Sequence, residues 1–220
     1  MNAPAGLDLA DKIQLAVSYA LRLTLVLAIG TAILSENWLT MFMASLVLVL
    51  SFSLSLIERN VKMFLPVEFE FATTLFIYGS LFLGEVHGYY TRFWWWDLVL
   101  HSFAGVTFGI VGFLVMYVLL KGHKVAASPV LIALFSFCFA VAIGSVWEIF
   151  EFSMDSVGGL NMQKSGLVDT MWDMMVNAGG ALVISIIGFF YVRGGESLIM
   201  RRVLSRLVER NPRLFKNRNV

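Results

Sequence analysis

The sequence has little charge: Asp, Glu, Lys and Arg make up 14% of its 220 residues, against 59% for hydrophobic residues. A soluble domain carries roughly 25% charged residues, so this composition excludes an ordinary soluble protein. The mean hydropathy of +0.80 supports the same conclusion. We therefore expect an all-α integral membrane protein in which one helical bundle uses the whole chain.

Cysteine is nearly absent, because Cys138 stands alone. An intrachain disulfide is therefore excluded, and no thiolate set is available to favour a soft metal. The first apolar segment is not followed by a cleavage site of the A-x-A type. We expect that segment to be a retained helix rather than a signal peptide.

Six apolar stretches are close to the roughly 20 residues that a helix needs to span a bilayer. They predict a six-helix transmembrane domain over residues 1–192 and a basic cytoplasmic tail over residues 193–220. The predicted spans are Gln14–Leu34, Trp38–Ile57, Val67–Gly84, Trp96–Leu120, Pro129–Phe152 and Val168–Val192.

Lysine and arginine are distributed unevenly between the two sides of this predicted bundle. Most of them lie in the N-terminal segment, in the second and fourth connections and in the tail, whereas the other three connections hold only Arg92 and Lys164. Because basic residues favour the cytoplasmic side, both termini are predicted to be cytoplasmic. Arg22 is the exception, since it lies inside the first span.

The tail has helical periodicity. Between Leu198 and Val208 apolar residues form one stripe, and Arg201, Arg202, Arg206 and Arg210 occupy the other face. This pattern predicts a basic amphipathic helix that suits an anionic inner leaflet.

Three polar clusters interrupt the apolar second half of the chain. Within each cluster the members are three or four residues apart, so they share one face of a helix. In the predicted topology all three clusters lie in the extracytoplasmic half of the membrane, where carboxylates are costly and tend to mark function. Glycine and alanine on the same faces favour close helix packing, which turns the clusters toward one another. The clusters are Asp97 with His101, Glu148 with Glu151, and Asp169 with Asp173 and Asn177.

Some of these residues also have simple structural interpretations. Asp97 and Asp169 are near predicted helix N-termini, where an acid is a good cap. A hydrogen bond to one carboxylate would satisfy His101 without a metal. Glu148 and Glu151 lie at the predicted end of the fifth span, where the helix dipole disfavours acids, so this position indicates that they have a partner.

Five acids and one imidazole on facing helices would repel one another unless they took up protons or bound a cation. Carboxylates with imidazole suit Mg²⁺, Mn²⁺, iron or Zn²⁺. We therefore expect a divalent metal ion, with Glu151 as general base or further ligand and Asn177 as an orienting donor. The predicted ligands are Asp97, His101, Glu148, Asp169 and Asp173.

The chain resembles the YjdF-type family of bacterial inner-membrane proteins in the strings LGEVHGYYTRFWWWDLVLHSFAG, WEIFEFSMD and QKSGLVDTMWDMMVNAGGA. The patterns D-x-x-x-H, E-x-x-E and D-x-x-x-D-x-x-x-N-x-x-G are also similar to those of the wider VanZ-like group. That group usually carries E-x-x-Q where this chain has Glu148 and Glu151, so a role for glutamine does not transfer. The resemblance covers about residues 83–181. It implies a bacterial inner-membrane protein linked to the cell envelope, and it supplies no reaction.

Three functions are consistent with these patterns. The first is a metal-dependent hydrolase or transferase that acts on a lipid or lipid-linked envelope substrate. The second is a proton- or ion-coupled transporter, which Glu68 and Glu70 at the inner end of the third span would support. The third is a non-catalytic envelope factor with a structural metal. We expect membrane lipids and no nucleic acid as partners. The sequence does not determine the oligomeric state or the roles of Arg22, Glu85 and His87.

Overall fold

The computed structural model describes residues 8–61, 64–121, 127–159 and 161–215, and all regular secondary structure in these ranges is helical. The chain divides into two compact units. Unit 1 comprises residues 1–94 and 202–213, and unit 2 comprises residues 95–201 and 214–220. The predicted boundary between a transmembrane domain and a tail at residue 192 stays a prediction.

Five helices among the described residues are long and apolar enough to cross a membrane. They are Leu9–Leu34, Val67–Val86, Trp96–Leu120, Pro129–Gly158 and Leu167–Val192. Each overlaps one of the six predicted spans, so the expectation of an all-helical membrane protein is confirmed to that extent.

The prediction of one continuous helix over residues 38–57 is wrong. The chain forms α2 (Trp38–Leu50) and α3 (Ser53–Val61), with a break at Ser51 and Phe52. Arg22 competes with the helical hydrogen bonds at this point, because its Nη2 donates to the main-chain oxygen of Ser51 at 2.8 Å. In a continuous helix that oxygen would instead accept from the N–H four residues later. Insertion of a side chain into the hydrogen-bond ladder is a known cause of such breaks.

Unit 1 is built around α1 (Leu9–Leu34), which packs against α2 and against α4 (Val67–Ile77). A π-helical segment, η1 (Tyr78–Val86), continues α4 and is followed by the short helix α5 (Tyr89–Arg92). The apolar core here includes Leu25, Val47 and Phe82. Helix α1 begins five residues before the predicted start, because Asp8 and Asp11 form a reciprocal capping box at its N-terminus.

Arg22 is buried inside unit 1 and has a clear partner. Its Nη1 donates to Glu70 Oε1 at 3.1 Å, its Nε donates to Ser51 Oγ at 3.2 Å, and Phe52 lies under the guanidinium at 4.2 Å. The guanidinium is thus paired and hydrogen-bonded, which is what a buried charge requires. Arg22 therefore holds α1, α4 and the α2–α3 break together.

The predicted amphipathic helix of the tail is present as α9 (Leu198–Arg210), and α10 (Pro212–Phe215) follows it. Two of its arginines bind acids of unit 1, and the expected contact of this helix with an anionic leaflet stays a prediction. Arg202 Nε donates to Glu68 Oε1 at 2.6 Å, and Arg206 donates to Glu68, to Asp8 and to Asp11. The pKa of Asp8 is lowered mostly by the main-chain N–H of Asp11, and to a smaller extent by the two guanidinium groups. We call the contacts of Arg202 and Arg206 with Asp8, Asp11 and Glu68 the α9 latch.

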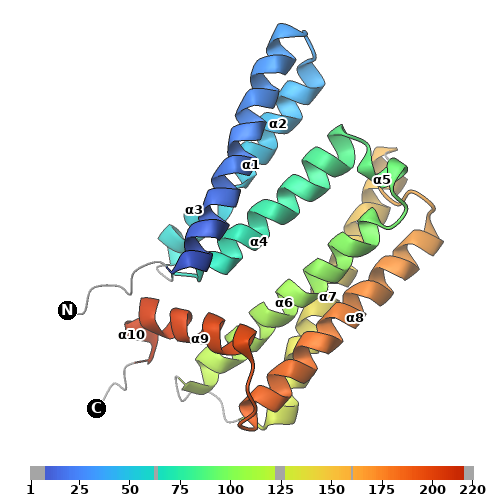
Figure 1. Cartoon of the computed structure of the whole chain (residues 1–220). Coiled ribbons are helices and arrows are strands. Elements are labelled where there is room, and N and C mark those ends of the chain that lie inside the picture. The colour runs from blue at the N-terminus through green and yellow to red at the C-terminus, as the bar shows by residue number, and fades with distance from the viewer. Residues whose placement is uncertain (1–7, 62–63, 122–126, 160, 216–220) are drawn as a thin grey trace. The chain divides into compact units, whose positions relative to one another are not determined.

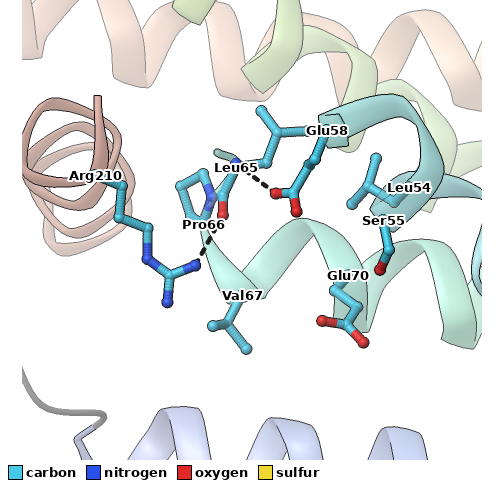
Figure 2. Close-up of a pocket in the computed structure, with 8 residues that line it drawn as sticks. All are labelled: Leu54, Ser55, Glu58, Leu65, Pro66, Val67, Glu70 and Arg210. Atoms are coloured by element: carbon cyan, nitrogen blue, oxygen red, sulfur yellow. Dashed lines mark hydrogen bonds between the residues drawn. The ribbon is translucent and has the colours of Figure 1, made fainter. Parts of the chain in front are cut away.

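The end of α9 is fixed to the segment that precedes α4. Figure 2 shows this region: Glu58 accepts from the main-chain N–H of Leu65 at 2.6 Å, and Arg210 donates to the carbonyl of Leu65 at 3.1 Å. Asn211 adds bonds to the N–H and the carbonyl of Phe64, at 2.8 and 2.6 Å. Residues distant in the sequence thus satisfy the main chain of this non-helical stretch.

Unit 2 is a three-helix bundle of α6 (Trp96–Lys121), α7 (Pro129–Gly158) and α8 (Leu167–Val192), in which each helix packs against the other two (Figure 1). The predicted end of the fifth span at Phe152 is wrong, because α7 continues to Gly158. It ends where Gly159 adopts a left-handed conformation with φ of 65°. The apolar run stops near residue 152, but neither proline nor glycine interrupts the helix there.

Small residues bring the three helices of unit 2 close together. A methyl group on Gly105 of α6 would overlap the carbonyl oxygen of Asn177 on α8, and one on Gly180 would lie 2.5 Å from the carbonyl oxygen of Ser102. A methyl group on Gly144 of α7 would lie 2.7 Å from the Asn177 amide. The faces that carry the polar clusters are therefore the packing faces.

Candidate metal centre

The three polar clusters meet at one end of unit 2. The residues come from the start of α6, from the interior of α7 and from the start of α8. They form two groups that share His101, one with Asp97 and Asp173 and the other with Glu148 and Glu151. In each group the nearest ligand atoms of the three residues lie within 4.8 Å of one another. The expectation that the clusters face each other therefore agrees with the structure.

The imidazole of His101 lies between the two groups. Its Nε2 is 3.4 Å from Asp97 Oδ1, one helical turn away on α6, and its Nδ1 is 3.6 Å from Glu148 Oε1 on α7. The two ring nitrogens of an imidazole point in different directions. Each nitrogen therefore faces a carboxylate from a different helix.

Burial is most extreme for two of the acids. Asp173 is 1% exposed and Glu148 is 4% exposed. Asp173 Oδ1 and both carboxylate oxygens of Glu148 have no hydrogen-bond partner among the described residues. A buried carboxylate oxygen without a partner is unfavourable by several kcal/mol. These atoms therefore require a proton or a cation.

The remaining two members form the rim of the centre. The side chain of Asp97 is 24% exposed, and Glu151 is also only partly buried. Neither is as enclosed as Asp173 or Glu148, so these two residues form the more exposed part of the centre. A partly exposed rim over a buried base is a suitable arrangement for a ligand that enters from outside.

The position of the glutamates removes one of the arguments made from the sequence. Because α7 extends to Gly158, Glu148 and Glu151 lie in its interior and not in its last turn. The unfavourable helix dipole therefore does not act on them. Glu148 requires a partner because its carboxylate is buried, and His101 lies next to it.

Asp169 and Asn177 are placed differently from the other predicted site residues. Asp169 lies in the first turn of α8 and supplies no ligand atom to either group. Asn177 is buried, and its Nδ2 donates to the main-chain oxygen of His101 at 3.5 Å. Asn177 therefore holds α8 against α6 at the level of the imidazole, which is a positioning contact.

Asp155 has a structural role that the sequence patterns did not reveal. Its two carboxylate oxygens accept from the main-chain N–H groups of Met162 and Gln163, at 2.6 and 2.9 Å. Gln163 in turn donates to Thr170 on α8 at 2.6 Å. Asp155 lies four residues after Glu151 and fastens the connection between α7 and α8.

The donor set decides which ligands the centre can hold. Carboxylate oxygens and imidazole nitrogens are hard or intermediate donors, which suit Mn²⁺, iron and Zn²⁺. Facing carboxylate and histidine side chains are also how helix bundles hold metal ions. The residues present therefore fit a divalent cation.

Comparisons with known proteins agree with a membrane protein. Residues 16–194 match the model of a family described as predicted membrane proteins, DUF2238. A protein of Thermotoga maritima described as uncharacterised is 29% identical over 118 residues, which are 51% of this chain and 59% of that protein. No solved structure matches the chain. The family match agrees with the YjdF-type resemblance, whereas the VanZ-like resemblance stays a prediction. Since the match covers most of its length, the chain belongs to the DUF2238 family of predicted membrane proteins.

Proposed function

We propose that this protein is a metal-dependent hydrolase or transferase that acts on a lipid or lipid-linked substrate of the cell envelope. The observation that carries the proposal is the convergence of Asp97, His101 and Asp173, with a buried carboxylate oxygen of Asp173 that has no hydrogen-bond partner. Such a group is stable next to a cation, and it is costly without one.

The proposal includes a location and a topology. The chain would lie in a bacterial inner membrane with both termini in the cytoplasm, and α2 with α3 would form a sixth crossing. The basic residues on the predicted cytoplasmic side support this orientation. The metal centre would then open toward the extracytoplasmic leaflet, where lipid-linked precursors of the envelope are used.

The residues of the centre would have different roles according to their positions. Asp97, His101 and Asp173 would hold the ion, and Asn177 would keep the imidazole in place through its main chain. Glu148 and Glu151, on the other side of the ring, remain for proton transfer or for a further ion. The chemistry that a bound divalent ion supplies is activation of water and stabilisation of oxyanion charge.

The surroundings of the centre support a lipid substrate. Trp147 precedes Glu148, Trp172 precedes Asp173, and the two tryptophans are 44% and 54% exposed. These apolar surfaces would face the bilayer at the level of the acids, since tryptophan favours the membrane interface. An acyl or prenyl chain could then lie along α7 and α8 while its headgroup reaches the rim.

The test combines metal analysis with turnover on the full chain in detergent or liposomes. We expect bound divalent metal and metal-dependent cleavage of a phosphate or ester bond in lipid-linked substrates, with turnover lost and the amount of bound metal reduced in Asp173→Asn. Glu196→Gln is the matched control, because this acid is exposed and lies outside the centre. Wild-type protein without stoichiometric metal, or metal-loaded protein without activity on any such lipid, would contradict the proposal.

The main alternative is a proton- or ion-coupled transporter. Such a carrier needs polar groups that reach the opposite side of the membrane. The two acids that favoured it are engaged otherwise, since Glu68 pairs with Arg202 and Arg206, and Glu70 pairs with Arg22. We therefore prefer an enzyme, and metal-dependent ion flux into liposomes without turnover would favour the carrier. A non-catalytic factor would bind metal and show neither.

A further inference from the structure

We infer that the centre holds two divalent cations, one on each ring nitrogen of His101, so that the imidazole bridges them. This inference rests on the proposed metal site and goes beyond it in the number of ions and in the role of Glu151. We assign Asp97 and Asp173 to the ion on Nε2, and Glu148 and Glu151 to the ion on Nδ1.

The distances at the ring are longer than those of strong charge-assisted hydrogen bonds and suit two shared ions. A charge-assisted N–H···O bond is about 2.7–2.9 Å long, whereas the two nitrogen–carboxylate separations at His101 are 3.4 and 3.6 Å. Two ligand atoms, each about 2.0–2.2 Å from a tetrahedral ion, lie about 3.4 Å apart. Both sides of the ring therefore have the spacing of ligands of one ion.

The unpartnered oxygens are divided between the two sides. Asp173 Oδ1 belongs to the group on Nε2, and the two oxygens of Glu148 belong to the group on Nδ1. One ion on Nε2 would satisfy Asp173, while the N–H on Nδ1 would face only one oxygen of Glu148, at 3.6 Å, and leave its other oxygen without a partner. One ion on Nδ1 would leave Asp173 Oδ1 without a partner. An ion on each side provides a partner for both acids while both stay ionised.

Charge balance leads to the same conclusion. The two groups contain four carboxylates, so a single divalent ion would leave two negative charges in a poorly hydrated part of the bundle. A second divalent ion compensates them. Its binding requires the remaining ring N–H of His101 to release a proton to the solvent, as metal binding to a protonated ligand generally does. The bridging imidazolate then adds one negative charge that both ions share.

Binding of the two ions is coupled, because both bind the imidazole of His101. Ions on opposite nitrogens of one imidazole lie about 6 Å apart, because each metal–nitrogen bond is about 2 Å long. This distance is longer than the about 3.5–4 Å of a metal pair that clamps a single reacting centre, so the two ions would contact different oxygen atoms of one substrate headgroup, such as a phosphate or a phosphate ester. Glu151, at the rim, becomes a ligand of the second ion in this arrangement.

The experiment is a zinc titration of the full chain in detergent after treatment with a chelator, followed by desalting and elemental analysis. We expect two zinc ions per chain in wild type and in the control Glu196→Gln. Asp173→Asn and Glu151→Gln should each retain one ion, because each removes a ligand of a different ion. His101→Ala removes the shared ligand and should lose both. Thermal melting and size-exclusion profiles show which variants remain folded.

A second readout distinguishes a bridged pair from two separate sites. With Mn²⁺ in place of Zn²⁺, wild type should show a spin-coupled electron paramagnetic resonance signal. Glu151→Gln should show the hyperfine-split signal of an isolated ion.

One zinc ion in wild type that both Asp173→Asn and Glu151→Gln abolish would overturn the two-ion centre and leave the proposed function intact. Zinc-free wild type would overturn both.

Discussion

Gly179 and Gly180 are adjacent on α8, yet a methyl group at each meets a different environment. At Gly179 nothing lies within 4 Å of the added carbon, whereas at Gly180 the main-chain oxygen of Ser102 on α6 lies 2.5 Å away. Ordinary contacts of this kind begin at 3.4 Å. Gly180→Ala must therefore separate α6 and α8 by most of an ångström, because main-chain atoms of two packed helices cannot rotate aside.

The size of the effect follows from two opposing contributions. Replacing a helical glycine by alanine stabilises a helix by about 0.5–1 kcal/mol, and this contribution is common to both variants. Overpacking costs about 1–3 kcal/mol and acts only at Gly180. We expect the free energy of unfolding of Gly180→Ala to be about 1–3 kcal/mol lower than that of Gly179→Ala. Reversible unfolding in mixed detergent micelles measures this difference.

The same pair of variants tests the metal centre, because α6 carries Asp97 and His101 while α8 carries Asp173. Separation of these helices should weaken zinc binding in Gly180→Ala and leave it unchanged in Gly179→Ala. Equal stability and equal zinc affinity in the two variants would refute the close packing of α6 on α8. That result would also remove the geometric basis of the metal centre.

Two further predictions concern unit 1. Arg22→Leu should lower the free energy of unfolding by about 3–5 kcal/mol, because it leaves Glu70 and the Ser51 carbonyl without their buried partner. Adding Glu70→Gln should recover part of this loss, and a double variant no more stable than Arg22→Leu alone would argue against this account. The α9 latch should weaken in acid, because the fold lowers the pKa of Asp8 below its ordinary value of 3.8. The stabilisation from ionised Asp8 is complete above pH 3.8 and is lost as the pH falls through the lower pKa of the folded state. Proteolysis of the tail at decreasing pH measures the release of α9, and Asp8→Asn should remove that part of the pH dependence.

Much of the helical layout was predictable from apolar length alone. Spans such as residues 96–120 and 168–192 agree with α6 and α8 to within one residue, because a long apolar run has no stable alternative to a helix in a membrane. The break after α2 was not predictable in this way. Its cause is Arg22 on another helix, and neither residue of the break is a proline or a glycine.

The end of α7 is a second case in which local signals were insufficient. The apolar run weakens at Ser153 and Asp155, which suggested an end near residue 152. The helix continues because Asp155 is occupied by the main chain of the returning connection, and Gly159 then supplies the left-handed cap. A residue that looks like an interruption in the sequence is thus part of the fold.

The sequence by itself determined that acids and one imidazole lie on three helix faces at one end of the bundle, because a spacing of three or four residues and the length of each span leave little choice. Only the tertiary structure decided how those groups are shared. It placed the ring of His101 between two pairs of acids, left Asp169 outside both, and used Asn177 to hold the backbone. The physical reason is that distances between helices depend on where glycines allow close approach, and that depends on contacts between residues that are far apart in the chain.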